Sequence, residues 1–420
     1  MPAWSAGVRL AASSVAGYRC MMSQQEQVAA LLREADTHNQ AGRHEAMRTA
    51  FERAAGLGSA YARHNLAICL AGGVGGSVDR KRAQELAQGL ADEGDPQGRQ
   101  MLAVAIASGW KDEPDYDRAL ALREDHARQG DMLAHLETAL LLAADSPDSP
   151  LIEERLRASA AANIFLARAA LARWLLEHDP ASPDIDAELR ALEQAKVFIA
   201  GRLRDIQKAG GHRPASTPGS VNTMVPDLNA RTIAGAIPAI IADYAVTRSL
   251  IFLRPAQIYH PSIGMMGPHP HRKSLTATLH LPHQDLVLHW LERRMAALAG
   301  LDWNTGERLV AIAYRKGEEY RPHVDYFSEA DGCAANENLQ RYGQRIRTAL
   351  VTLYDGFEGG ATQFPRFDAS WRGAIGDALV FDSTSPTGEP LPLSLHAGEP
   401  VSEGLKIIGS IWYREKPFLD

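Results

Sequence analysis

Three side chains near the end of the sequence have the types and the spacing of a metal-ligand set. His323 and Asp325 are separated by one residue, and His396 follows much later in the chain. Two imidazoles and one carboxylate form the facial triad of non-haem Fe(II) oxygenases, which leaves further metal positions open. We therefore expect these residues to bind Fe(II), although manganese, cobalt, nickel or zinc can occupy the same ligands without turnover. The chemistry indicated is oxygen activation.

Lys406 adds a fourth residue to this predicted site. It follows His396 after a short interval and precedes the apolar Ile407. A buried ammonium group in such surroundings needs an anionic partner, and the distal carboxylate of 2-oxoglutarate can supply one. The sequence predicts a turn at Glu403-Gly404, after which the next strand returns antiparallel and carries the lysine into the pocket.

The predicted ligands require a framework of β-strands. Residues two apart in a strand project to the same face, so His323 and Asp325 can contact one metal ion from a single strand. His396 must then come from a distant strand that lies alongside. Four segments have the periodicity of strands, namely 309–314, 347–354, 377–381 and 407–413, and the segment 284–299 has that of a helix. They predict a double-stranded β-helix, or jelly roll, with supporting helices.

Six segments around the His-x-Asp motif carry a resemblance to a known family. They are residues 310–320, 345–354, 358–365, 376–381, 393–401 and 406–412. In this order they resemble the catalytic domain of prolyl 4-hydroxylases, in the 2-oxoglutarate and Fe(II)-dependent dioxygenase superfamily. The resemblance covers residues 240–417. It departs from the family pattern at Glu399, where cysteine is frequent, and at Ile407, where tryptophan is expected, and these changes leave the substrate open.

The resemblance implies a role for each matching residue. His323, Asp325 and His396 would bind Fe(II). Lys406 would bind the C5 carboxylate of 2-oxoglutarate. Three more would contact the cosubstrate or line its pocket, namely Tyr314, Thr348 and Trp412. Two would lie near the substrate, namely Arg345 and Arg414. The implied enzyme is a dioxygenase of the procollagen-proline 4-dioxygenase kind, which uses O2 and has ascorbate as its reductant.

The first half of the chain predicts a repeat of helix pairs. Residues 25–205 are rich in alanine and leucine at helical spacing. Similar segments begin at Gly58, Gly94 and Gly130, at equal intervals of 36 residues. They resemble tetratricopeptide-like repeats of the Sel-one type, and such units stack into an α-solenoid. A helix at 185–209 is expected to close the array. We expect its concave surface to recruit a protein or peptide substrate, with scaffolding or dimerisation as the alternative.

These segments define an α+β multidomain chain. The repeat domain is expected at 23–209, a Gly/Pro/Ser-rich linker at 210–230, and the dioxygenase domain at 231–420. Residues 1–22 have no acidic side chain, and Met21-Met22 follow the two arginines of this segment. The segment is either a transit peptide or the product of a start codon placed too early. In both cases we expect it to be poorly ordered.

A loop at 255–275 is expected to control access to the predicted site. It contains His260, His269 and His271, whose spacing matches no familiar metal site. A mobile lid is the favoured interpretation, and a second metal site is the alternative.

Composition narrows the location and the partners. A net charge of −7 argues against a protein that binds nucleic acid backbones. Three scattered cysteines form no disulfide framework, which is typical of a reducing compartment and favours the cytoplasm. No apolar run approaches about 18 residues, so no membrane span is expected.

The sequence leaves two alternatives to peptidyl-proline hydroxylation. The same chemistry can act on a small molecule or on another side chain. The chain can also be an oxygen-responsive interaction scaffold, in which the repeats carry the main function and the iron domain is a sensor.

Overall fold

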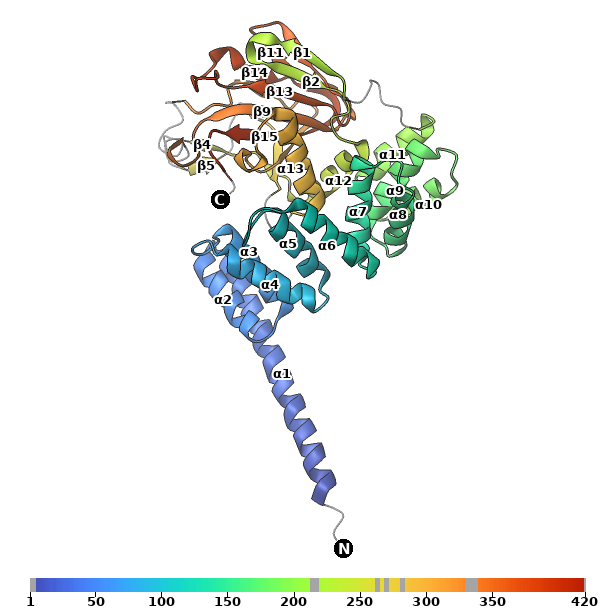
Figure 1. Cartoon of the computed structure of the whole chain (residues 1–420), viewed down its shortest axis with the longest axis vertical. Coiled ribbons are helices and arrows are strands. Elements are labelled where there is room, and N and C mark those ends of the chain that lie inside the picture. Colours follow the sequence, from blue (N-terminus) through green and yellow to red (C-terminus); the bar gives the residue numbers. More distant parts are fainter. Residues whose placement is uncertain are drawn as a thin grey trace. The chain divides into compact units, whose positions relative to one another are not determined.

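The computed structural model describes residues 5–211, 219–260, 265–267, 272–279, 284–328 and 339–418 (Figure 1). The chain divides into two compact units, Met1–His126 and Ala127–Asp420. The boundary falls inside the helical region 23–209, so the later helices belong to the same unit as the β-sheets. Residues 5–22 are part of a helix in the described part of the chain, and the prediction of poor order at 1–22 stays a prediction.

The first unit is helical, as predicted. Its helices are α1 (Ser5–Gln40), α2 (His44–Gly56), α3 (Ala60–Gly72), α4 (Arg80–Asp92), α5 (Pro96–Ala107) and α6 (Tyr116–Arg128), the last of which ends just beyond the boundary. Buried alanine and leucine side chains such as Ala67 and Leu70 of α3 form the packed faces of these helices. Small apolar residues allow helices to approach closely, which explains the alanine-rich composition of the repeats.

The 36-residue interval in the sequence corresponds to a recurring turn between helices. Gly58, Gly94 and Gly130 all have a positive φ angle, at 85°, 83° and 86°. The residue after each glycine caps the next helix: Ser59, Asp95 and Asp131 accept hydrogen bonds from backbone amides in the first turns of α3, α5 and α7. A left-handed glycine ends one helix and an N-cap side chain starts the next, so the repeat motif is a structural device.

The second unit begins with five more helices. They are α7 (Met132–Asp145), α8 (Leu151–Ala161), α9 (Phe165–His178), α10 (Asp184–Gln194) and α11 (Ile199–Lys208). The prediction of one helix over 185–209 is wrong, because the chain breaks between α10 and α11. Lys196 has a φ of 55° in this break, a conformation that no helix interior accommodates.

Two antiparallel sheets follow. In the described part of the chain, the larger sheet has the order β1-β2-β13-β9-β15-β7-β6-β3, with β10 also paired to β15. The smaller sheet has the order β12-β11-β14-β8, and β4 pairs with β5 separately. The bounds are β1 Val221–Val225, β2 Ala230–Ile233, β3 Arg254–Pro255, β4 Ile258–His260, β5 Met265–Gly267, β6 Leu275–Thr278, β7 Val310–Arg315, β8 Tyr320–His323, β9 Arg345–Tyr354, β10 Phe357–Gly359, β11 Thr362–Phe364, β12 Ala369–Trp371, β13 Ala378–Asp382, β14 His396–Gly398 and β15 Val401–Arg414. This is the predicted jelly roll.

The core of the jelly roll lies between the two sheets. One cluster of buried side chains joins Ile312 and Phe381 of the larger sheet to Phe364 of the smaller one. Phe364 and Phe381 are fully buried and meet edge to face, with ring centroids 5.1 Å apart. Burial of one such ring contributes about 1.5–3 kcal/mol to stability, so the aromatic pair helps to hold the sheets together.

Two helices support the larger sheet, and the helix predicted at 284–299 is one of them. Helices α12 (Ala239–Ser249) and α13 (Leu286–Ala299) both contact β9, and α12 also contacts α9 of the helical segment (Figure 1). Helix α13 begins where the side chain of Asp285 accepts a hydrogen bond from the Leu288 amide. No helix among the described residues is both long and apolar enough to cross a bilayer.

Two local features differ from the predictions. Strand β1 lies within the predicted linker 210–230 and pairs with β2, so the sheet begins before residue 231. The predicted turn at Glu403-Gly404 is also wrong, because both residues are part of the continuous strand β15. Gly404 has a φ of 76°, and it remains in the strand because Phe357 of β10 pairs with it. Strands β14 and β15 run on in the same direction, because both pair antiparallel with the consecutive strands β10 and β11.

Candidate active site

The three predicted ligands lie together at one end of the smaller sheet. His323 at the end of β8 pairs directly with His396 at the start of β14, and their ring centroids are 4.3 Å apart. Asp325 follows in the bend after β8, with Oδ1 3.8 Å from His323 Nε2 and Oδ2 3.6 Å from His396 Nε2. One ligand atom from each residue falls within 4.8 Å of the others. The cluster therefore has the compactness of a metal site.

Backbone contacts decide which nitrogen of each imidazole faces the cluster. His323 Nδ1 lies 2.9 Å from the Arg321 carbonyl oxygen, and His396 Nδ1 lies 3.0 Å from that of Ser394. A carbonyl oxygen only accepts, so each Nδ1 must carry a proton. In the neutral ring, each Nε2 then presents a lone pair toward Asp325, and this is how metal-ligating histidines are oriented in proteins.

Charge and burial favour the metal-binding protonation states. Burial lowers the pKa of His323 to about 3, and the neighbouring His396 acts in the same direction. Burial alone would raise the pKa of Asp325, but the charges of His396 and His323 and a hydrogen bond from Thr348 outweigh it and lower the pKa. At neutral pH the site thus combines a neutral His323 with an anionic carboxylate, the forms that bind divalent metals.

Thr348 holds the carboxylate ligand in place. Its side chain is fully buried on β9, and its hydroxyl donates a 2.6 Å hydrogen bond to Asp325 Oδ2. The resemblance implies that Thr348 contacts the cosubstrate, whereas the contact seen here is with a metal ligand. Partners of this kind orient a ligand and tune its affinity.

Lys406 lies next to the triad, across the strand pair β15 and β7. It pairs with Tyr314, and its ammonium lies 5.5 Å from the tyrosine ring centroid and donates a 2.6 Å hydrogen bond to the Gly360 carbonyl oxygen. Lys406 is 4 % exposed, and burial lowers its pKa to about 8, partly opposed by Glu399. In the described part of the chain, no carboxylate forms an ion pair with Lys406. The group therefore offers a binding position for an anion.

A small cavity of about 40 Å³ joins the ammonium and the ligands. Its lining includes the predicted residues Tyr314, His323, Asp325, His396, Lys406 and Trp412. Three apolar side chains, Ile312, Leu350 and Ile408, form part of the remaining wall.

The two predicted substrate residues have different positions. Arg345 forms two hydrogen bonds to Glu307, of 2.6 and 2.7 Å, and its guanidinium lies 4.4 Å from the Trp412 ring centroid. It lines an outer cavity of about 660 Å³ together with Asp325 and Trp412. Arg414 also reaches Glu307, at 3.2 Å, but is 1 % exposed and lines neither cavity. The structure therefore brings only Arg345 of this pair to the approach to the site.

Sequence reasoning missed two residues of the site. Tyr320 stacks on His323 with ring centroids 3.5 Å apart, and Arg272 lies 5.1 Å from the Tyr320 ring centroid. Both line the small cavity and the outer one. The position of Tyr320 at the start of the strand that carries His323 could have predicted its place in the site, whereas Arg272 comes from a segment distant in the sequence. The second metal site considered at 255–275 rests on histidine side chains outside the described residues. The lid stays a prediction, and in the described part of this segment β4 pairs with β5.

Comparison with known proteins agrees with this geometry. Residues 309–414 match the family model of the 2OG-Fe(II) oxygenase superfamily. A putative prolyl 4-hydroxylase of Acanthamoeba polyphaga mimivirus is 35% identical over 117 residues, which cover 28% of this chain and 48% of that protein. The chain spans about half the length of this relative and of prolyl 4-hydroxylase 1 from Arabidopsis thaliana, to which it is 32% identical.

Two solved structures are each similar to less than half of the chain. A viral collagen prolyl hydroxylase from Paramecium Bursaria Chlorella virus-1 aligns with 44% of this chain and 95% of its own, at 23% identity and a TM-score of 0.35. A Sel1 repeat protein from Oxalobacter formigenes aligns with 43% of this chain and 87% of its own, at 16% identity and a TM-score of 0.33. The family match and the sequence relatives identify a 2OG-Fe(II) oxygenase domain in the C-terminal region, with prolyl 4-hydroxylases among its homologues.

Proposed function

We propose that this protein is a 2-oxoglutarate- and Fe(II)-dependent hydroxylase that acts on a prolyl residue of a protein or peptide. The observation that carries the proposal is the pairing of a compact two-histidine, one-carboxylate cluster with the buried Lys406 in one cavity. The first feature suits a divalent metal, and the second suits a dicarboxylate. The homology to prolyl 4-hydroxylases supports proline as the target.

The residues present fit Fe(II). His323 and His396 would bind it through Nε2, because their Nδ1 atoms face backbone carbonyl oxygens. Asp325 would bind it through the carboxylate that Thr348 orients. When bound, the metal supplies the redox chemistry that activates O2 at the expense of 2-oxoglutarate. Ascorbate is proposed as the reductant that keeps the metal in the Fe(II) state.

The chain's own residues would position the cosubstrate and keep the site dry. The Lys406 ammonium would bind the C5 carboxylate, an interaction strengthened by the low polarity of its surroundings. Burial raises the pKa of Tyr314, so its hydroxyl stays protonated and can donate a hydrogen bond to the same carboxylate. The apolar walls formed by Ile312 and Ile408 would exclude water around the reacting atoms.

Substrate recognition is proposed to involve two further parts of the chain. Arg345 and Trp412 line the outer cavity beside Asp325, so a peptide that approaches the metal would meet them first. The helical repeats would recruit the protein substrate, since stacked helix pairs expose long surfaces that suit a polypeptide. The scattered cysteines support a cytoplasmic location.

The test is succinate formation from 2-oxoglutarate by the full chain with Fe(II) and ascorbate. The wild type is compared with His396→Ala and with His44→Ala, a control for an exposed histidine of α2. We expect turnover that rises with a proline-rich peptide pool, disappears in His396→Ala and persists in His44→Ala. Turnover that ignores peptide would favour a small-molecule substrate. Failure to bind 2-oxoglutarate would refute the enzyme and leave the interaction scaffold.

A further inference from the structure

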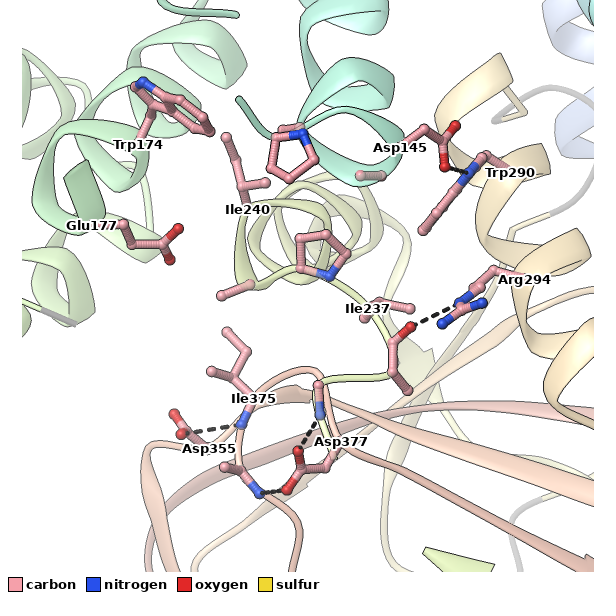
Figure 2. Close-up of a pocket in the computed structure, with 18 of the residues that line it drawn as sticks. Asp145, Trp174, Glu177, Ile237, Ile240, Trp290, Arg294, Asp355, Ile375 and Asp377 are labelled. Atoms are coloured by element: carbon pink, nitrogen blue, oxygen red, sulfur yellow. Dashed lines mark hydrogen bonds between the residues drawn. The ribbon is translucent and has the colours of Figure 1, made fainter. Parts of the chain in front are cut away.

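A second, larger cavity lies in the same compact unit as the candidate active site. Its volume is about 880 Å³, and it is lined by the ends of α7, α9 and α11 on one side and by α12, α13 and the loop 374–377 on the other (Figure 2). No residue of the metal cluster or of the Lys406 pocket belongs to its lining. A concave site of this size accommodates a drug-sized ligand or several residues of a peptide.

The walls of this cavity are largely apolar and aromatic. Trp174 of α9 and Trp290 of α13 line it together with Ile237, Ile240 and Ile375. One face of the Trp174 indole stacks on His178, with ring centroids 3.6 Å apart. Walls of this composition bind the aliphatic part of a ligand, while the few polar groups decide its charge and orientation.

Four carboxylates and two guanidinium groups line the cavity. Most of them already have partners. Arg202 pairs with Asp355 at 2.6 Å, and Arg294 donates to the Ala236 carbonyl oxygen at 3.0 Å. Asp377 accepts from two backbone amides, and Asp145 accepts from the Trp290 indole at 3.2 Å. These groups shape the site without requiring a ligand.

Glu177 is different. Figure 2 shows its carboxylate directed into the cavity from α9. Its nearest cation is Arg173, at 3.9 Å, and that guanidinium already donates to Asp243 at 2.5 Å. In the described part of the chain, Glu177 receives no hydrogen bond. Burial raises its pKa to about 7, although Arg173 acts to lower it. A cation in the cavity would supply a direct charge-assisted hydrogen bond, for which the 3.9 Å ion pair with Arg173 is too long.

We propose that the cavity is a second substrate site, which binds a lysine or arginine side chain of the protein substrate through Glu177. The excess of carboxylates over guanidinium groups in the lining matches a cation and disfavours an anion. The indoles and isoleucines cover the aliphatic stem of the basic side chain, as in other sites for amphipathic cations. This inference rests on the proposed function, because it takes the substrate to be a polypeptide.

Strand β9 runs from the candidate active site toward the second cavity and gives a scale for their separation. Thr348 on this strand contacts the metal ligand Asp325, and Tyr354 at its end precedes Asp355 in the cavity lining. A strand rises about 3.3 Å per residue, so Thr348 and Asp355 lie roughly 23 Å apart. An extended peptide spans about 3.3–3.6 Å per residue. The basic residue must therefore lie at least about six residues from the target proline.

The test measures peptide binding to the intact protein by calorimetry. The probe is a proline-rich peptide of about 16 residues with two lysines at one end, compared with the same peptide that has glutamine in their place. We expect wild type to bind the lysine peptide about tenfold more tightly, since a charge-assisted contact contributes about 1.4 kcal/mol or more. Glu177→Gln should abolish this preference, and Glu154→Gln, at an exposed position of α8, should retain it.

A second variant tests the shape of the site. Ala239→Trp introduces bulk at a half-buried position of the lining, and it should weaken the lysine peptide while leaving the glutamine peptide unchanged. A lysine preference that survives Glu177→Gln would overturn the proposal, as would equal binding of the two peptides by wild type. Binding of spermidine at Glu177 without any lysine preference would also overturn it. Succinate formation, measured separately, reports failure of the proposed enzyme activity independently of these outcomes.

Discussion

The hydroxyl of Thr348 provides a sharp test of how the metal site is built. Thr348→Val keeps the shape of the side chain and removes the 2.6 Å hydrogen bond to Asp325 Oδ2. Both residues are buried, so water cannot readily replace the lost donor. A hydrogen bond to a charged group contributes about 1.5–3 kcal/mol. Loss of a group that orients a metal ligand lowers metal affinity about 10- to 100-fold, which corresponds to about 1.4–2.7 kcal/mol. The two estimates agree.

The assay is titration of the metal-free protein with Co(II), followed by visible absorption. We expect Thr348→Val to raise the dissociation constant about 10- to 100-fold. The hydrogen bond lowers the pKa of Asp325, so its removal raises that pKa. Protons then compete with the metal at higher pH, and the midpoint for loss of metal moves upward. Thr352→Val is the matched control, because Thr352 is buried on the same strand but contacts no ligand of the cluster.

The same variant separates two roles for Thr348. If Co(II) affinity is unchanged and the dissociation constant of 2-oxoglutarate rises instead, the reasoning from the Asp325 contact is refuted. Thr348 would then act on the cosubstrate, as the resemblance in the sequence implies. If Thr352→Val loses as much affinity for Co(II) and for 2-oxoglutarate as Thr348→Val does, the effect is a general weakening of the fold.

Three further outcomes follow from buried charges. Lys406→Met should weaken 2-oxoglutarate binding about 30-fold or more in calorimetry with Mn(II), whereas Lys316→Met, at an exposed position, should not. Because the pKa of Lys406 is lowered to about 8, the wild-type affinity for 2-oxoglutarate should fall above that pH, and the affinity of Lys406→Met should not change with pH. Glu177→Gln should raise the free energy of unfolding at pH 8, by at most roughly 3 kcal/mol, but not at pH 4. The pKa of Glu177 is raised from 4.5 to about 7, so the native state binds the proton more tightly and wild-type stability falls as pH rises through this window. Urea denaturation that shows no gain at pH 8 would contradict this. Arg173→Met should destabilise the protein by about 3–5 kcal/mol, because Asp243 then lacks its cation, and adding Asp243→Asn should recover part of the loss.

Local patterns were sufficient for much of the fold. Helix 284–299 was predicted from apolar spacing, and α13 spans Leu286–Ala299. Strand 377–381 was predicted likewise, and β13 spans Ala378–Asp382. Such periodicity is written in neighbouring residues, so it survives without tertiary information. The break between α10 and α11 was not predicted, because lysine at position 196 does not indicate a left-handed backbone conformation.

Strand ends depended on partners that are distant in the sequence. Gly404 looks like a turn residue, and its φ of 76° is indeed one that turns use. A Cβ at this position would lie 2.1 Å from the Gly356 carbonyl oxygen, so glycine is required here by the close approach of β10. The residue therefore accommodates a neighbouring strand, and β15 continues through it without a turn.

The sequence by itself determined the chemistry of the candidate site. The residue types at His323, Asp325, His396 and Lys406 and their spacing in the sequence are local properties, and they alone predict a metal and a dicarboxylate. Only the tertiary structure decided which side chains support them. Thr348 against Asp325, Arg345 against Glu307 and Glu177 in its cavity are contacts between segments far apart in the chain. Such contacts arise from the packing of whole strands and helices, which no local pattern records.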